Sequence, residues 1–404
     1  MKSKDRILAA INKEEVDHVP IYFPCFGFSP PEYLRWKREG KDVKYWYTMR
    51  LEHIHTLPQR WDLQDDFERV KAWRSLGVDD ILDVSFPWDI HPDVKIKDWR
   101  EGDLLCRVYE TPEGEVIQKV RKTSEEIPPG WVIQPDKPAL FEDFNLPRSV
   151  KFPLSEKEDV PKLRYLLQGP RKEKIEEYME RMAVIKDFSS KNGVFVQGWP
   201  IFGMDGVVWL MGIERAVIAA MMEPDFFQEV IDLVYEFDLM RMEMMLEIGG
   251  VDMVVQRGWY SSTDFWSPKL FREWVSPNLK KLVKIAHEKG VKFGYVMTTG
   301  VNVLIEDLIE AGVDLLYFVD PQGDDINLEE FKEKVKGKIT VCGGISTSLV
   351  LNRMDRKKVK EEVEKVLGIM GKQGFILSCV DALFPDTPWE SVEAMVDAWR
   401  KWEA

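Results

Sequence analysis

The sequence predicts one (β/α)₈ barrel that spans all 404 residues. Two observations carry this prediction: short apolar segments bounded by turn residues, and helical periodicity in the stretches that connect them. Eight such segments alternate with connections long enough for helices, which is typical of a parallel sheet. An open sheet of this class would carry a glycine-rich phosphate loop after its first strand, and residues 23–31 do not match that pattern.

The eight predicted strands are residues 19–23, 78–84, 194–199, 251–256, 291–297, 313–319, 339–344 and 375–379. Six of the glycines lie directly before or near the start of a strand, where a helix should end: Gly77, Gly193, Gly250, Gly290, Gly312 and Gly374. Glycine adopts the left-handed conformation at low cost and is therefore favoured just after a helix. The glycines thus mark the helix ends expected of alternating helices and strands.

Capping residues indicate where several helices begin. Ser267 and the proline after it suit an N-cap and a first helical position, and Pro277 should bend or restart that helix. Asn327 is predicted to cap the helix that follows it. Thr387 and Glu390 match a capping box, in which each side chain bonds the backbone of the other residue, at the start of the last helix.

An insertion, residues 86–192, separates the second and third predicted strands. Two alternating runs around the turn at residues 111–114 predict a β-hairpin within a small sheet. The Pro-rich tract 125–147 is expected to be irregular. Because the insertion follows the carboxyl end of a strand, it is interpreted either as a lid or partner-docking surface, or as a decorative addition.

Charge and composition exclude several classes of protein. The net charge is −14, and basic residues are interleaved with acidic ones, so nucleic acid is not expected as a partner. No window holds 18 consecutive apolar residues, so no membrane span is expected. The amino terminus lacks a secretory pattern and the four cysteines form no CxxC pair, which predicts a cytoplasmic location. Apolar helix faces would permit a homodimer.

Three of the four cysteines lie at the ends of predicted strands one, seven and eight: Cys25, Cys342 and Cys379. In a closed barrel strand eight is the neighbour of both others. Three thiolates that converge there could bind zinc, which takes sulfur ligands tetrahedrally. The alternative is that each cysteine is an ordinary buried small side chain.

Aromatic side chains gather at the same predicted rim. Trp199, Trp259 and Phe318, with Gln256 and Met297, are the candidate substrate-binding residues, and they suit a flat, weakly polar organic substrate. The catalytic candidates are Asp320, Tyr295 and Arg257. Asp320 could act as a general acid or base, and Arg257 could orient an anionic group. Either charge could equally be half of a structural ion pair.

The sequence resembles the uroporphyrinogen decarboxylase superfamily and, within it, the branch of corrinoid-dependent methyltransferases. Residues 5–23, 267–300 and 371–399 carry the likeness, and the strand ending in Ser-Cys followed by a Thr-Pro helix start is its most specific part. The resemblance implies a (β/α)₈ barrel and methyl transfer between a small donor and a corrinoid carried by a separate protein.

Two departures qualify the resemblance. The decarboxylases of the family bind many carboxylates through arginines just after the first strand, where the first arginine here is Arg35. The zinc methyltransferases carry His-X-Cys at the end of strand five and Cys at the end of strand eight. Cys379 matches the last position, but Tyr295 and Met297 occupy the other two.

These patterns favour a demethylating methyltransferase that acts on a small methylated donor, such as a methoxylated aromatic compound. A zinc ion would help because cleavage of a methyl–oxygen bond leaves a poor alkoxide or phenolate, which a Lewis acid stabilises. The alternatives are a decarboxylase or other lyase on a small carboxylated substrate, and a barrel that binds a ligand without catalysis.

Overall fold

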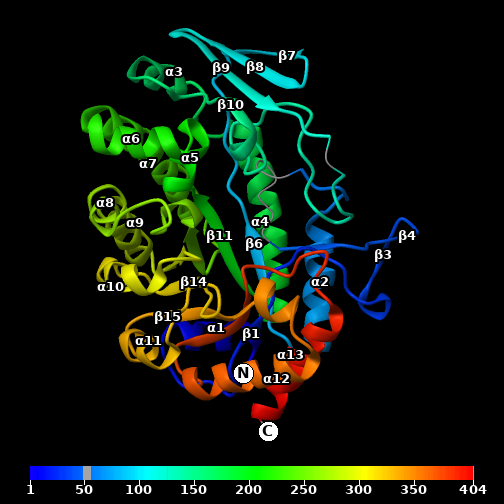
Figure 1. The fold of residues 1–404 in the computed structure, drawn as a ribbon. Coiled ribbons are helices and arrows are strands. Elements are labelled where there is room, and N and C mark those ends of the chain that lie inside the picture. Colours follow the sequence, from blue (N-terminus) through cyan, green and yellow to red (C-terminus); the bar gives the residue numbers. More distant parts are fainter. Residues whose placement is uncertain (49–55, 125, 404) are drawn as a thin grey trace.

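The computed structural model describes residues 1–48, 56–124 and 126–403, and all eight predicted strands are present in one parallel sheet (Figure 1). The strands are β1 (Ile21–Tyr22), β6 (Ile81–Val84), β11 (Phe195–Ile201), β12 (Met253–Gln256), β13 (Lys292–Val296), β14 (Leu315–Val319), β15 (Thr340–Ser346) and β16 (Phe375–Val380). Their order is β1-β16-β15-β14-β13-β12-β11-β6. Asp79 N donates to Ile21 O at 3.0 Å and pairs in parallel with Tyr22, which joins the two outer strands. The sheet therefore closes into the predicted (β/α)₈ barrel.

The strands are buried on both faces. Every residue of β11, β14, β15 and β16 is buried. Parallel strands covered by helices on one side and by the barrel interior on the other have no solvent-facing positions. This burial explains why the strands appear in the sequence as continuous apolar runs.

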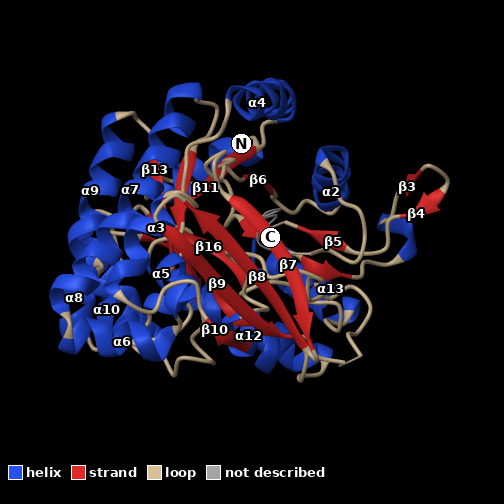
Figure 2. Cartoon of the chain, turned by 90° about the horizontal axis from the view of Figure 1, so that it is seen from above, coloured by secondary structure: helices blue, strands red, loops and turns tan. Residues whose placement is uncertain are grey.

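Helices lie around the outside of the strands, as the view from above shows (Figure 2). They are α2 (Leu63–Ser75), α4 (Lys172–Asn192), α5 (Met204–Met211), α6 (Ile213–Met222), α7 (Pro224–Ile248), α8 (Pro268–Trp274), α9 (Ser276–Glu288), α10 (Val301–Ala311), α11 (Leu328–Val335), α12 (Arg356–Met370) and α13 (Trp389–Glu403). Helix α1 (Ser3–Ile11) closes the amino-terminal end of the barrel, where Lys4 N donates to Gly193 O and Thr340 Oγ1 donates to Ala10 O. In the part of the chain that the structure describes, no helix combines the length and apolar character needed to cross a bilayer.

The predicted helix signals are mostly confirmed. The six glycines named above all have φ between 61° and 99°. Ser267 accepts a hydrogen bond from Leu270 N and Asn327 accepts one from Glu330 N, while Pro277 lies in the first turn of α9. The capping box at Thr387 is different from the prediction. Its hydroxyl accepts from Phe384 N at 3.0 Å, so it stabilises the preceding loop instead of the helix start.

The insertion contains a four-stranded antiparallel sheet in the order β10-β9-β8-β7, which stands at the end of the molecule opposite the two termini (Figure 1). The strands are β7 (Lys95–Glu101), β8 (Leu104–Thr111), β9 (Gly114–Arg121) and β10 (Ser149–Lys151). Thr111 pairs with Gly114, so the chain turns within residues 111–114. Residues 126–145 hold no helix or strand, and residue 125 lies outside the described residues. Helix α3 (Val160–Arg164) leads on to α4.

Short elements complete the described chain. Two small pairs are formed by β2 (Phe26–Phe28) with β5 (Trp46–Tyr47), and by β3 (Lys37–Arg38) with β4 (Lys41–Asp42). The 3₁₀ turns are η1 (Glu32–Leu34), η2 (Leu146–Arg148), η3 (Lys157–Asp159) and η4 (Trp259–Ser261), and η5 (Thr347–Leu351) is a π-helical turn.

A buried arginine ties helix α2 to the barrel. The Arg69 guanidinium is fully buried and donates to Asp80 at 3.0 Å, to Asp66 at 2.8 Å and to the carbonyl of Ile81 at 2.9 Å. Burial raises the pKa of Asp80 to about 6 although Arg69 opposes this shift. The carboxylates therefore depend on the arginine for compensation of their charge.

We expect Arg69→Met to lower the free energy of unfolding by about 3–5 kcal/mol, because it leaves Asp66 and Asp80 buried without their cation. Urea unfolding followed by circular dichroism measures the change. The control is Lys191→Met, which breaks an exposed pair with Asp187 and should lower the free energy by less than about 0.5 kcal/mol. Equal effects of the two substitutions would contradict the structural role of Arg69.

Candidate functional site

A cavity of about 360 Å³ lies at the carboxyl ends of four barrel strands. We call it the rim cavity. Residues that follow β1, β12, β13 and β16 line it together with one residue of the insertion: Phe26, Asp143, Arg257, Trp259, Tyr260, Asp264, Phe265, Thr298, Thr299, Asp381, Ala382 and Phe384. Barrel enzymes carry their active sites at this end. Fold and cavity together therefore define a barrel of the enzyme type.

Arg257 forms the wall of the rim cavity next to β12. It is 5% exposed, and its guanidinium lies 4.6 Å from the ring centroid of Trp209 and 4.5 Å from that of Trp259. It donates to Asp205 and to Asp143, each at 3.2 Å. Burial raises the pKa of Asp205 to about 7, although the arginine opposes this shift. Two carboxylates thus compensate the single guanidinium.

Asp143 fastens the insertion to the barrel. Besides Arg257, it accepts hydrogen bonds from Trp209 Nε1 at 2.8 Å and from the Tyr260 hydroxyl at 3.1 Å. Asp143 lies in the irregular tract of the insertion, whereas its three partners belong to the barrel and its helices. The insertion therefore contributes a wall of the cavity.

Trp259 and Asp381 are hydrogen-bonded neighbours in the wall of the cavity. Trp259 Nε1 donates to Asp381 Oδ2 at 3.2 Å. The Trp259 ring stacks on Trp199 with centroids 6.2 Å apart and lies 6.3 Å from Phe318. Burial raises the pKa of Asp381, which Trp259 partly counters. A carboxyl group that keeps its proton more readily than usual thus faces the cavity.

A buried polar network inside the barrel positions Trp199, the ring on which Trp259 stacks. Asp83 accepts hydrogen bonds from Trp199 Nε1 at 2.7 Å and from Gln197 Nε2 at 2.6 Å, and Tyr317 donates to Gln197 at 2.7 Å. Burial raises the pKa of Asp83 to about 7. The carboxyl group fixes the orientation of Trp199, on which Trp259 stacks.

The structure places the predicted site residues unevenly. Arg257 and Trp259 line the rim cavity, and Trp199 and Phe318 support it from below. Tyr295 and Met297 are fully buried instead, and the Tyr295 hydroxyl is 2.6 Å from Ser261 Oγ. Neither residue lines the cavity, because both point into the packed interior.

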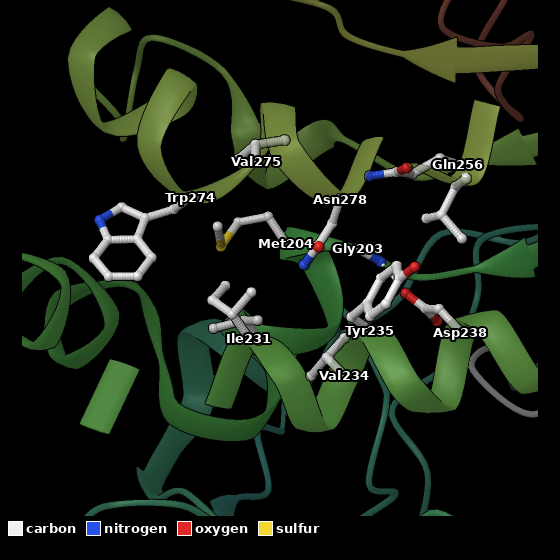
Figure 3. A pocket seen from close by; sticks show the side chains of 12 residues that line it. Gly203, Met204, Ile231, Val234, Tyr235, Asp238, Gln256, Trp274, Val275 and Asn278 are labelled. Atoms are coloured by element: carbon white, nitrogen blue, oxygen red, sulfur yellow. Dashed lines mark hydrogen bonds between the residues drawn. The ribbon is translucent and has the colours of Figure 1, made fainter. Parts of the chain in front are cut away.

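Asp320 and Gln256 also lie outside the rim cavity. Asp320 Oδ1 accepts the backbone N–H groups of Gln322 and Gly323, so the carboxylate stabilises its own turn. Gln256 lines a different cavity of about 30 Å³ between α5, α7, α8 and α9. Tyr235 and Asn278 line the same cavity (Figure 3). That volume suits one or two waters and is too small for a substrate.

The three candidate metal ligands are fully buried. Burial raises the pKa of Cys25, Cys342 and Cys379, and Cys25 donates to the carbonyl of Phe23 at 3.4 Å. Across residues 1–48, 56–124 and 126–403, no three His, Cys, Asp or Glu side chains are placed to hold one metal ion. The arrangement of these side chains does not fit a zinc ion.

Three of the charged or aromatic residues of the cavity had no predicted role: Asp143, Asp264 and Phe384. Tyr260 and Asp381 lie where the sequence predicts the rim, just after the fourth and eighth strands, although neither was assigned a catalytic role. Asp143 could not be predicted, since an irregular tract has no periodicity that reports which side chains turn toward the barrel.

Comparison with known proteins establishes the family. A model of the uroporphyrinogen decarboxylase (URO-D) family matches residues 149–402, and the chain belongs to that family. The uroporphyrinogen decarboxylase of Rickettsia bellii (strain RML369-C) is 30% identical over 136 residues, which are 33% of this chain and 38% of the relative. The family resemblance inferred from the sequence is thus confirmed, although the aligned part spans little more than a third of that relative.

Solved structures share the fold. A methyltransferase from Methanosarcina mazei superposes with a TM-score of 0.59 and 18% identity, and the match covers 100% of both chains. A B12-independent methionine synthase from Shewanella sp. W3-18-1 reaches a TM-score of 0.44 at 9% identity over 96% of this chain and 97% of the other, which is too distant to support an argument. The first match establishes a common barrel architecture along the whole chain.

We expect Asp83→Asn to change how stability depends on pH. Because burial raises the pKa of Asp83 from its ordinary value of 3.8 to about 7, the folded protein binds more protons than the unfolded chain between these values. The contribution of Asp83 to the free energy of unfolding therefore falls as pH rises through this window, by at most about 1.4 kcal/mol per pH unit. Urea unfolding between pH 5 and 7.5 should show that the free energy of unfolding of Asp83→Asn rises relative to that of the wild type as pH increases. Parallel pH profiles would contradict the assignment.

For Cys379 we expect structural rather than metal-binding behaviour. Cys379→Ser places a more strongly hydrated hydroxyl at a fully buried position and should lower the free energy of unfolding by about 1 kcal/mol or more. Elemental analysis of protein purified without chelator or metal resin should give much less than one zinc per chain, in wild type and variant alike. Stoichiometric zinc that disappears in Cys379→Ser would restore the metal-binding interpretation.

Proposed function

We propose that this protein transfers a methyl group from a small methylated donor, bound in the rim cavity, to the cobalt of a corrinoid carried by a separate protein. The observation that carries the proposal is an aromatic-walled cavity at the active end of a barrel that matches a methyltransferase over its full length. Family membership supports an enzyme, and the name of that structural relative supports methyl transfer.

The rim cavity has the composition of a site for a small organic molecule. Its size falls within the range of ordinary ligand pockets, and five of its lining residues are aromatic. Rings that surround a methyl group keep water from the reacting carbon, which favours transfer to an acceptor over side reactions. The few polar groups are fixed by hydrogen bonds before the donor arrives, so binding need not order them.

The residues of the cavity have distinct proposed roles. Arg257 holds Asp143 and Asp205 in place and acts as a positioning residue for the wall. Asp381, whose pKa is raised by burial, can supply a proton to a heteroatom that would otherwise leave as an anion. The electron pair that forms the new bond to the methyl carbon would come from a reduced corrinoid on the docked carrier protein.

The corrinoid protein must reach the open end of the barrel. The insertion is fastened there through Asp143, and its antiparallel sheet stands at that end of the molecule (Figure 1). We propose the insertion as part of the docking surface. This role accommodates the docking interpretation of the sequence without requiring the insertion to move as a lid.

Decarboxylation is the second candidate, favoured by the names of the family model and of the Rickettsia bellii relative. A carboxylated substrate needs a cationic partner in the cavity. Among the described residues that line it, Arg257 is the one cation, and two carboxylates already pair with it. The charge balance of the cavity therefore favours methyl transfer over the binding of a polycarboxylate.

In a methyl-transfer assay, we expect wild-type protein to methylate reduced cobalamin with at least one donor from a panel of O-, N- and S-methyl compounds. The change in cobalamin absorbance reports the reaction. Trp259→Phe keeps an aromatic ring but removes the hydrogen bond to Asp381, so kcat/KM should fall by about tenfold. The matched control is Trp99→Phe, which removes an indole–carboxylate bond to Glu101 on the insertion surface and should leave kcat/KM unchanged.

Two results would count against this proposal. The first is release of carbon dioxide from a carboxylated aromatic compound with no methyl transfer from any donor in the panel. The second is methyl transfer that is equally slow in the wild type and in Trp259→Phe, because the rim cavity would then not be the reaction site.

A further inference from the structure

We propose that the rim cavity binds a small organic cation of the quaternary ammonium class, and that this cation is the methyl donor. The inference rests on the proposed methyl transfer, since it names the donor for that reaction. It differs from the methoxylated aromatic compound that the aromatic rim alone suggested.

Four side chains of the cavity already donate hydrogen bonds to carboxylates of the protein. Arg257 donates to Asp143 and Asp205, and the Tyr260 hydroxyl also donates to Asp143. Trp259 Nε1 donates to Asp381. Thr299 on the far wall likewise donates to a carboxylate, that of Asp264. An anionic or acceptor-rich ligand would have to break these bonds, whereas a ligand that carries positive charge would not.

The charge of the cavity favours a cation as well. Asp143, Asp264 and Asp381 line it against the single guanidinium of Arg257. Even with a proton on Asp381, whose pKa is raised, Asp143 and Asp264 outweigh the arginine. The chain as a whole carries a net charge of −14, which draws cations toward its surface and repels anions.

The aromatic rings provide the second attraction. Phe26 and Phe384 lie 6.2 Å apart, and Phe384 stacks on Trp131 at 5.1 Å. Tyr260 and Phe265 also line the cavity, and their ring centroids are 6.0 Å apart. Ring faces attract quaternary ammonium groups, which cannot donate hydrogen bonds and are recognised mainly by aromatic cages with nearby carboxylates. Because Arg257 already covers the ring of Trp259, we assign the cation to these other rings.

The bond changes are balanced with such a donor. The carbon–nitrogen bond breaks, and nitrogen keeps the electron pair and leaves as a neutral tertiary amine. The reduced cobalt of the proposed partner supplies the electron pair for its new bond to the methyl carbon. No proton is consumed and no anionic leaving group forms, so this donor does not need the proton that Asp381 could supply to a donor with an anionic leaving group. This chemistry is compatible with Tyr295 and Met297 at the positions where the family resemblance implies zinc ligands.

Isothermal titration calorimetry tests the ligand class without catalysis. Choline and its neutral carbon isostere, 3,3-dimethylbutan-1-ol, have the same shape but differ in charge. We expect choline to bind the wild-type protein about tenfold more tightly or better. Tetramethylammonium, which lacks the hydroxyl group, should also bind. Equal binding of choline and the isostere, or binding of neither, would overturn the inference.

Variants locate the binding. Asp264→Asn should weaken choline binding several-fold, and Phe384→Leu should weaken choline more than the isostere. Glu113→Gln removes one negative charge from the exposed hairpin turn and should leave both affinities unchanged. Unchanged affinity in both cavity variants would place the cation elsewhere and overturn the proposal.

The methyl-transfer assay, run with choline, tetramethylammonium and neutral methoxy compounds, separates this inference from the proposed function. Selective cation binding with no methyl transfer from any donor supports the ligand class and overturns methyl transfer. Methyl transfer from neutral methoxy compounds alone, without selective cation binding, overturns the inference and leaves the proposed function in place.

Discussion

The arrangement of the barrel rim depends on the contacts of the Arg257 guanidinium. It lies between the rings of Trp209 and Trp259 and reaches Asp205 on one side and Asp143 on the other. It thereby joins helix α5, the loop after β12 and the insertion, three segments that are far apart in the sequence. A lysine could not replace it, because only a planar guanidinium stacks between two rings while donating in two directions. Two carboxylates offset the cost of burying this charge. Arg257 therefore has a structural role, and its charge is largely neutralised before any substrate binds.

Buried carboxyl groups hold the loops around Arg257 in place. Asp205 accepts the N–H of Tyr260 after β12, and Asp238 accepts the N–H groups of Phe202 and Gly203 after β11. Asp83 does the same for the indole of Trp199. Burial raises the pKa of all three to about 7, which is the energetic consequence of keeping a carboxyl group among apolar strands. The strands pack through apolar contacts, and the hydrogen bonds of these carboxyl groups fix the positions of the loops and rings at the cavity.

The sequence was sufficient to predict the barrel because its strands are buried on both faces and its helices begin and end at capping residues and glycines. It was less informative about the site, because position at a strand end does not determine where a side chain points. Alternate residues of a strand face opposite sides, and Gln256 and Tyr295 turn toward other packing instead of the cavity. The prediction that three cysteines end neighbouring strands is wrong for Cys342, which is the third residue of β15 and pairs with Ile376, whereas Cys379 pairs with Ile345 three positions further along. Asp143 was out of reach because its tract has no regular structure.

The insertion decides more about the ligand than family membership does. The family model matches residues 149–402, whereas Asp143 and Phe26, which help to line the cavity, lie before that region. The part of the chain that matches the family model provides six of the eight barrel strands, the loop after β12 and the end of β16. Asp143, the carboxylate from the insertion that pairs with Arg257, lies before the matched region. The proposed preference of the cavity for positive charge therefore depends on a residue outside that region. A fold can host many reactions, and the groups that line its site select among them. In this chain one such group, Asp143, is delivered by an irregular tract that only the folded structure brings to the rim.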